Sequence, residues 1–163
     1  MNGEYFSHAP ILSAAMTFTS GPVLELGAGF GSTLMLHGLC GSTKRSLTTI
    51  ESDKQWILKF INFGREWHKF RQVKDFIDLP EYSQEWGLVF VDHGIAEQRG
   101  YSVRMLKDTP MIVVHDTCHY FLYDYEPILS EFKYRWDYKI NGPQTTVVSN
   151  TIDVRKKFAE VCL

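Results

Sequence analysis

Residues 22–31, with the sequence PVLELGAGFG, decide the fold of this chain. Residues 22–26 suit a buried strand, and they lead directly into a turn with glycines at positions 27, 29 and 31. Glycine permits a positive φ and lets the backbone approach a ligand closely. A helix predicted over residues 32–39, capped by Ser32 or a neighbour, would place free N–H groups beside that turn. The stretch therefore predicts a strand–turn–helix unit with a ligand at its turn.

The rest of the chain alternates short apolar runs with helical patterns, which is typical of βαβ units around a mainly parallel sheet. A leading helix is predicted over residues 4–18. The next four predicted strands cover residues 46–51, 69–73, 87–91 and 111–114. The remaining predicted helices cover residues 53–63, with Asp53 as the N-cap and Gly64 as the stop, 96–106 and 125–132.

The last two predicted strands, residues 135–140 and 145–150, are separated by only four residues, Asn141 to Gln144. A connection that short cannot hold a parallel crossover, so the two strands must form an antiparallel hairpin. This ending separates the chain from an ordinary dinucleotide-binding fold, whose sheet is all parallel. For the tail, residues 152–163, the sequence allows a short helix that packs either on this domain or on another subunit.

Composition predicts a single globular domain over residues 1–163. Of these, 44% are hydrophobic and 22% charged, and the net charge of −2 comes with dispersed basic residues. Without a basic face, no nucleic-acid partner is expected. No apolar stretch is long enough to span a bilayer and no signal peptide is evident, so no membrane partner is expected. The three cysteines show no CxxC spacing, which is compatible with a reducing, cytoplasmic location.

Glu51 ends the second predicted strand about 20 residues after the glycine turn. A carboxylate there can accept hydrogen bonds from both hydroxyls of a ribose, which indicates a nucleoside cofactor. A nicotinamide fingerprint needs G-x-G-x-x-G, but this chain has Ser32 at the sixth position. Ser32 and the terminal hairpin both speak against a nicotinamide-dependent oxidoreductase, the weakest of the alternatives.

The spacing Glu25-x-Gly27-x-Gly29-x-Gly31 resembles the first motif of class I S-adenosylmethionine-dependent methyltransferases, and Glu51 is similar to their acidic second motif. The resemblance covers about residues 22–150. It implies a three-layer α-β-α sandwich around a seven-stranded, mainly parallel sheet of order 3-2-1-4-5-7-6 with strand 7 antiparallel. The hairpin predicted above fits that order.

The resemblance also implies roles toward the cofactor, S-adenosylmethionine. Glu25 would hold water or the methionine amino group, and Glu51 would bind the ribose hydroxyls. Asp75 would lie near the adenine amine, and Phe76 or Trp56 would stack on the adenine. The full set expected around the cofactor is Glu25, Gly27, Ala28, Gly29, Gly31, Glu51, Ser52, Asp75, Phe76 and Asp92.

A second cluster follows two neighbouring strands: Asp92-His93 after the fourth and His115-Asp116 after the fifth, with His119 nearby. Because parallel strands end at one edge of the sheet, these groups should lie near the glycine turn. Asp92 is expected near the transferred methyl group, with His93 or His115 as the general base. The alternative interpretation is that both aspartates cap the following helices.

A magnesium ion held by Asp92 and Asp116 is a further alternative. His115 stands where a paired acidic site needs its second carboxylate, which speaks against that ion. The fourth strand is followed by Asp92-His93-Gly94-Ile95 and not by the Asn/Asp-Pro-Pro-aromatic motif of many amino-methylating enzymes. The chain instead looks like small O-methyltransferases, which implies methylation of a hydroxyl on a small molecule or glycan.

The sequence leaves two alternatives open, one about oligomerisation and one about activity. The chain has no insertion that would form a substrate lid, so a homo-oligomer that completes the pocket is among the expected partners. Because fold does not guarantee activity, the rival hypothesis is a non-catalytic nucleoside-binding or partner protein that retains the methyltransferase fold.

Overall fold

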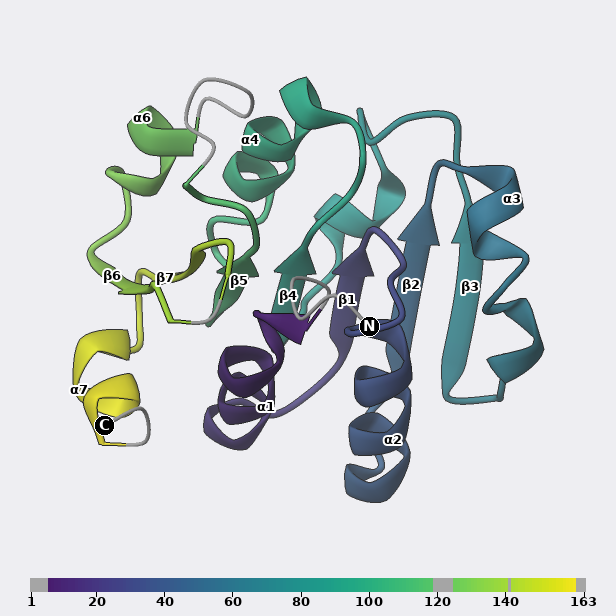
Figure 1. Cartoon of the computed structure of the whole chain (residues 1–163), viewed down its shortest axis with the longest axis horizontal. Helices are drawn as coiled ribbons and strands as arrows, with labels where there is room; N and C mark the ends of the chain where they lie inside the picture. The colour runs from purple at the N-terminus through teal and green to yellow at the C-terminus, as the bar shows by residue number, and fades with distance from the viewer. Residues whose placement is uncertain (1–5, 119–124, 141, 161–163) are drawn as a thin grey trace.

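A computed structural model describes residues 6–118, 125–140 and 142–160 (Figure 1). Its centre is a seven-stranded sheet of order β3-β2-β1-β4-β5-β7-β6, as predicted. β7 runs antiparallel to both β5 and β6, whereas the other neighbours are parallel. The strands are β1 (Val23–Leu26), β2 (Leu47–Glu51), β3 (His68–Gln72), β4 (Leu88–Val91), β5 (Ile112–Val114), β6 (Tyr134–Tyr138) and β7 (Thr145–Ser149).

Helices pack on both faces of this sheet. The α-helices are α1 (Ala9–Phe18), α2 (Thr33–Thr43), α3 (Lys54–Ile57), α4 (Ala96–Met105), α6 (Tyr125–Leu129) and α7 (Val154–Ala159), and the short 3-10 helices are η2 (Ile61–Phe63) and η3 (Pro80–Ser83). One apolar core joins α1, α2 and α7 to the sheet, and a second joins α4 and α6 to the opposite face. The three-layer prediction is therefore confirmed.

Alternation along β1 explains how one strand serves both cores. Val23 packs with the α1–α2 side, and Leu24 and Leu26 pack with the α4–α6 side. Glu25 shares the face of Val23, because successive side chains of a strand point to opposite faces. All four residues of β1 are buried. The ionisable side chain of Glu25 is therefore buried in the middle of the sheet, beneath α2.

The structure corrects the helix predicted over residues 53–63. Asp53 does cap it, accepting hydrogen bonds from the N–H groups of Gln55 and Trp56 at 2.7 and 2.9 Å. The α-helix nevertheless ends at Ile57, and the chain tightens into i→i+3 hydrogen bonds, including Phe60 N–H to Ile57 O at 2.9 Å. This tightening buries Phe60 completely, a packing gain that helical periodicity does not reveal.

The two ends of the chain add smaller corrections. α1 begins at Ala9, with Pro10 in its first turn, where a missing N–H costs nothing. The predicted start of that helix at residue 4 lies outside the described residues. The tail, for which the sequence allowed two alternatives, forms α7. Its Phe158 packs against Phe18 and Trp136 with ring centroids 5.4 and 5.1 Å apart. Among the described residues, no helix is long and apolar enough to cross a membrane.

Candidate functional site

The glycine turn lies where β1 and β4 end side by side. Gly27 has a φ of +99°, and a Cβ on it would lie 2.5 Å from backbone atoms of Asp92 and His93. Contacts below 3.0 Å force a shift of the backbone, so only glycine fits here. Gly27 therefore sets the close approach between the turn and the residues after β4.

Glu51 fastens the turn to β2. One carboxylate oxygen, Oε2, accepts a hydrogen bond from the Ala28 N–H at 2.9 Å. The other, Oε1, accepts from the N–H groups of Ser52 and Asp53 at 2.7 and 2.8 Å, and from the Ser52 hydroxyl at 3.3 Å. Because a carboxylate offers about four acceptor positions, Oε2 retains one for an external hydroxyl. Glu51 thus shapes the turn without lining the cavity described below, and its predicted bonds to ribose hydroxyls stay a prediction.

Glu25 lies beneath the turn and is fully buried. Its carboxylate accepts hydrogen bonds from the hydroxyls of Thr33 at 3.0 Å and Thr49 at 2.7 Å. Burial in the apolar layer raises the pKa of Glu25 from 4.5 to about 7, against the opposing effect of these hydroxyls. Its predicted role toward a methionine amino group stays a prediction, since its contacts are with α2 and β2.

A cavity of about 350 Å³ opens at the carboxyl ends of β1, β4 and β5. This volume lies in the range of small-molecule sites. One wall is the glycine turn and the start of α2, and the opposite wall carries acid and imidazole groups. The lining residues are His8, Gly29, Phe30, Gly31, Ser32, Asp92, His115, Asp116 and Pro143. The structure thus brings together five predicted residues: Gly29, Gly31, Asp92, His115 and Asp116.

Asp92 and His115 form the polar centre of this cavity. His115 Nδ1 lies 3.3 Å from Asp92 Oδ1, and His115 Nε2 lies 2.9 Å from the hydroxyl oxygen of Ser7. Burial works to lower the pKa of His115, but the hydrogen bond and charge of Asp92 and the charge of Asp116 raise it above 6.5. The pair is therefore arranged for proton exchange at the edge of the cavity.

Arg99, which no sequence pattern singles out, contacts both carboxylates of the site. It is 4% exposed and reaches Asp92 Oδ1 at 3.2 Å and Asp116 Oδ2 at 3.4 Å. It also donates to the backbone oxygens of His93 and His115. An arginine within helical residues 96–105 carries no local signal for this role, because the partners come from two other loops.

The structure places His93 and Phe76 away from the cavity. His93 is fully buried, outside the cavity, with its Nε2 3.1 Å from Ser102 Oγ. Its ring stacks on the buried Phe76 ring, with centroids 3.8 Å apart. Burial lowers the pKa of His93 to about 3, which makes it a weak base. The roles of His93 as general base and of Phe76 as adenine platform stay predictions, because neither residue lines the cavity.

Asp75 and the aromatic residues near the turn have different surroundings. Asp75 accepts a hydrogen bond from the Ile77 N–H at 3.1 Å, the local bond of a turn residue, and does not line the cavity. Trp56 donates from Nε1 to Ala28 O at 2.5 Å and packs against Phe30 with centroids 5.6 Å apart. Phe30 is 46% exposed and lines the cavity, so it offers an aromatic surface in addition to the predicted Phe76 or Trp56.

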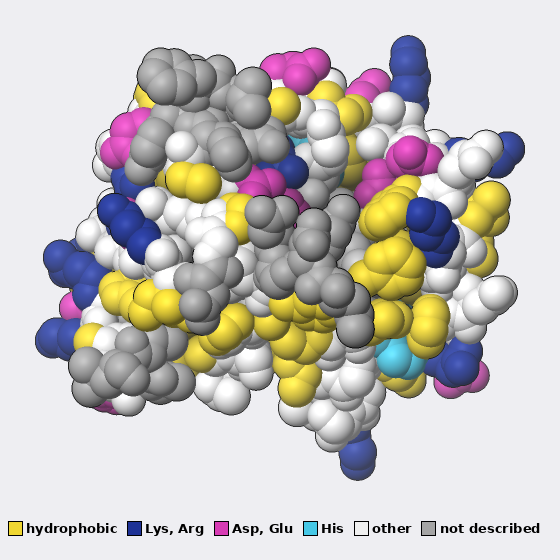
Figure 2. Space-filling view, viewed as in Figure 1, with side chains coloured by type: hydrophobic (Ala, Val, Ile, Leu, Met, Phe, Trp, Pro, Cys, Tyr) yellow, Lys and Arg dark blue, Asp and Glu magenta, His cyan; other side chains and the backbone are white. Residues whose placement is uncertain are grey.

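Hydrophobic side chains gather on the surface over α2 and α3 (Figure 2). The residues of this patch with large exposed fractions are Phe30, Leu34, Leu58, Ile61 and Phe63. Lys59 lies over the Trp56 ring, with its Nζ 3.6 Å from the ring centroid. The patch therefore begins at the cavity wall and extends away from it.

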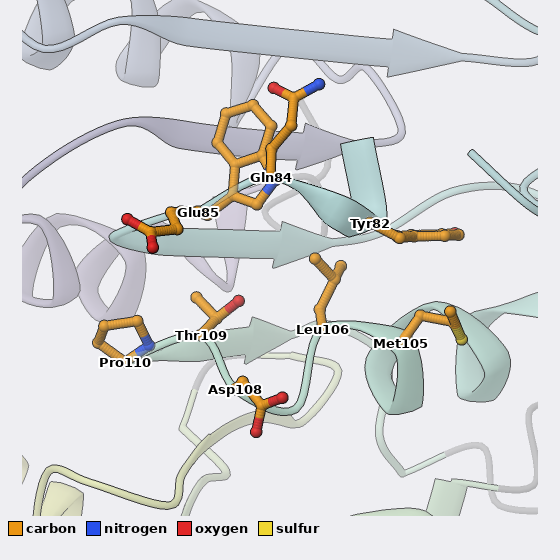
Figure 3. A pocket seen from close by; sticks show the side chains of 9 residues that line it. Tyr82, Gln84, Glu85, Met105, Leu106, Asp108, Thr109 and Pro110 are labelled. Atoms are coloured by element: carbon orange, nitrogen blue, oxygen red, sulfur yellow. The ribbon is translucent and has the colours of Figure 1, made fainter. Parts of the chain in front are cut away.

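A second cavity, of about 380 Å³, lies at the opposite ends of β4 and β5 (Figure 3). Its lining includes Glu85, Asp108, Pro110 and the end of α4 at Met105. It contains carboxylates but no imidazole, and it is separated from the glycine turn by the length of β4. Parallel α/β sheets bind ligands at the carboxyl ends of their strands, so the first cavity is the candidate site.

Solved structures with the same fold are known. An O-methyltransferase of tomaymycin synthesis from Streptomyces achromogenes, in complex with S-adenosylmethionine, has a TM-score of 0.64 at 15% identity, over 90% of this chain and 79% of that one. The N-methyltransferase NodS from Bradyrhizobium japonicum, bound to S-adenosylhomocysteine, has 0.59 at 17% identity, over 86% and 83%. An RNA methyltransferase from Salinibacter ruber has 0.55 at 15% identity, over 88% and 93%.

These likenesses establish the fold as that of class I S-adenosylmethionine-dependent methyltransferases. No protein-family model and no curated protein matches the sequence. The three structures belong to enzymes that act on different acceptors, so the shared fold does not select one.

Proposed function

We propose that this protein is an S-adenosylmethionine-dependent methyltransferase that methylates a hydroxyl group of a small molecule or glycan. The observation that carries the proposal is the cavity itself, which joins the glycine turn to the Asp92–His115 pair. A methyl donor on one wall would face a proton acceptor on the other. The fold supports the methyl donor, and the polar pair supports a hydroxyl acceptor.

The residues present fit S-adenosylmethionine at three points. Gly29 and Gly31 leave the backbone open along one wall, and the single free acceptor position on Glu51 Oε2 suits one ribose hydroxyl. Phe30 offers an exposed ring next to them. When bound, the cofactor supplies a methyl group already activated by its sulfonium.

The protein's part in the reaction is alignment and proton removal. In our proposal His115 takes the proton of the acceptor hydroxyl at Nε2, directly or through the Ser7 hydroxyl 2.9 Å away. Asp92 orients the imidazole through Nδ1 and stabilises the imidazolium that forms. Arg99 holds Asp92 in place and keeps it ionised.

The first experiment is calorimetric titration of the purified chain with S-adenosylmethionine and S-adenosylhomocysteine. Glu51→Ala should weaken binding at least about tenfold, because it removes the ribose acceptor and releases Ala28 from its anchor. Glu66→Ala, which removes an exposed carboxylate at the far side of β2 and β3, is the matched control and should bind as the native chain does.

Compounds that carry an acceptor hydroxyl are then screened for methylation by the native chain and by His115→Asn. The asparagine can still form hydrogen bonds but cannot take the proton. Binding without turnover for any acceptor would support the rival, a nucleoside-binding protein that retains the fold. No binding of either ligand by the native chain would refute the cofactor and the enzymatic proposal together.

A further inference from the structure

Three side chains from different parts of the chain converge in the cavity: His8 just before α1, Asp92 after β4 and His115 after β5. One potential ligand atom of each lies within 4.8 Å of those of the other two. The rings of His8 and His115 meet edge to face with centroids 4.8 Å apart. Two imidazoles and one carboxylate on one wall form a set of ligands known from transition-metal sites.

His8 gives the second, independent observation. It is 3% exposed and lines the cavity, yet neither of its ring nitrogens has a hydrogen-bond partner among the described residues. Leaving a buried polar group unpaired destabilises the native state. A cation bound through one nitrogen would remove much of that destabilisation. The unpartnered imidazole therefore points to a ligand in the cavity.

The charged groups around the cavity favour one class of cation over another. Arg99 and His115 both contact Oδ1 of Asp92, which leaves Oδ2 to face a ligand. Arg99 also contacts Asp116 Oδ2, so the two carboxylates share one buried positive charge. Magnesium prefers several anionic oxygens, whereas neutral imidazole suits zinc, iron, cobalt and nickel. Magnesium on Asp92 and Asp116 is thus disfavoured by Arg99.

We propose that His8, Asp92 and His115 bind a divalent first-row transition-metal ion. Bonds of about 2.1 Å would place neighbouring ligand atoms of a tetrahedral site about 3.4 Å apart, so rotations of these side chains must close the remaining gap. Three protein ligands leave a coordination position open toward the cavity, as catalytic zinc sites do. There a metal would lower the pKa of a bound water or hydroxyl.

This proposal is independent of cofactor binding, although it has a consequence for the acceptor chemistry. A metal would use the imidazole lone pair that His115 needs as a base. The role of His115 as a base therefore applies to the metal-free chain, and in the metal-bound chain the metal would activate the hydroxyl. The metal-binding test below needs no S-adenosylmethionine, so its failure leaves the cofactor proposal standing, and the reverse also holds.

The experiment uses the tag-free, chelator-treated chain of residues 1–163 titrated with Co²⁺, followed by displacement with Zn²⁺. We expect one ion per chain, visible absorption of low-symmetry Co²⁺, and no displacement by millimolar Mg²⁺. His8→Ala should weaken Co²⁺ binding at least about tenfold. His37→Ala, which removes a partly buried histidine bonded to His68 on the other side of the glycine turn, is the matched control and should bind as the native chain does.

Pulsed EPR of the Cu²⁺-loaded native chain gives a readout that does not depend on a variant's folding. Hyperfine coupling to two imidazoles would support the site. One imidazole or none, equal Co²⁺ affinity in His8→Ala and native protein, or displacement by Mg²⁺ would each overturn the proposal.

Discussion

The substitution Glu25→Gln should remove a pH dependence of stability that the buried carboxylate imposes. Burial raises the pKa of Glu25 from 4.5 to about 7, so between these values the native state holds a proton that the unfolded chain has lost. The free energy of unfolding therefore falls as pH rises through this window. At 1.36 kcal/mol per pH unit, the native chain should lose about 2–3 kcal/mol between pH 5 and pH 8.

Glutamine keeps an oxygen for the hydroxyls of Thr33 and Thr49 but does not titrate. The other titratable groups near Glu25 are His68, which reaches it through Thr49, Asp92 and Cys40, whose thiol has its pKa raised to about 11 by burial and stays neutral at these pH values. Burial lowers the pKa of His68 to about 4, so it stays neutral above pH 5. The charge of Asp92 adds a smaller contribution in the same direction as burial.

The assay is urea unfolding followed by circular dichroism at pH 5, 6, 7 and 8 for native and Glu25→Gln protein. The variant should gain stability relative to the native chain as pH rises, with the difference growing by about 2–3 kcal/mol. The exposed Glu66→Gln variant is the control and should track the native chain. A native–variant difference that stays constant across these four pH values would refute the reasoning.

Three further substitutions test the packing of the site, each by urea unfolding. Gly27→Ala should lower the free energy of unfolding by about 2 kcal/mol or more, because of positive-φ strain and the clash with the backbone after β4. Gly94→Ala is the control and should change little, since no atom lies within 4 Å of its Cβ. Equal costs for the two variants would contradict the close-approach argument. Asp53→Ala should cost about 1 kcal/mol by removing the α3 cap, and Asp53→Asn, which can still cap, should recover most of it. Arg99→Met should cost about 3 kcal/mol, because it leaves the carboxylates of Asp92 and Asp116 without their buried cation; a neutral effect would show that these acids do not need it.

The terminal hairpin and the glycine turn could be predicted from the sequence because they depend on local patterns, whereas the full strand order was implied by the resemblance to class I S-adenosylmethionine-dependent methyltransferases. The short link between β6 and β7 permits only an antiparallel pair, and glycines at 27, 29 and 31 after a buried strand mark a turn that must approach another backbone. Gly29, Gly31, Asp92, His115 and Asp116 could be placed in one cavity because parallel strands end at the same edge.

Tertiary structure alone decided which way the buried polar groups point. His93 and His115 each follow a buried strand, yet one stacks on Phe76 inside the core and the other faces the cavity. His8 lies just before α1 and Arg99 lies within α4, neither in a motif, and they join the site only because α1 and α4 pack on opposite faces of the sheet. Sequence patterns set the elements and their edges, whereas the burial of each polar side chain depends on partners far away in the chain.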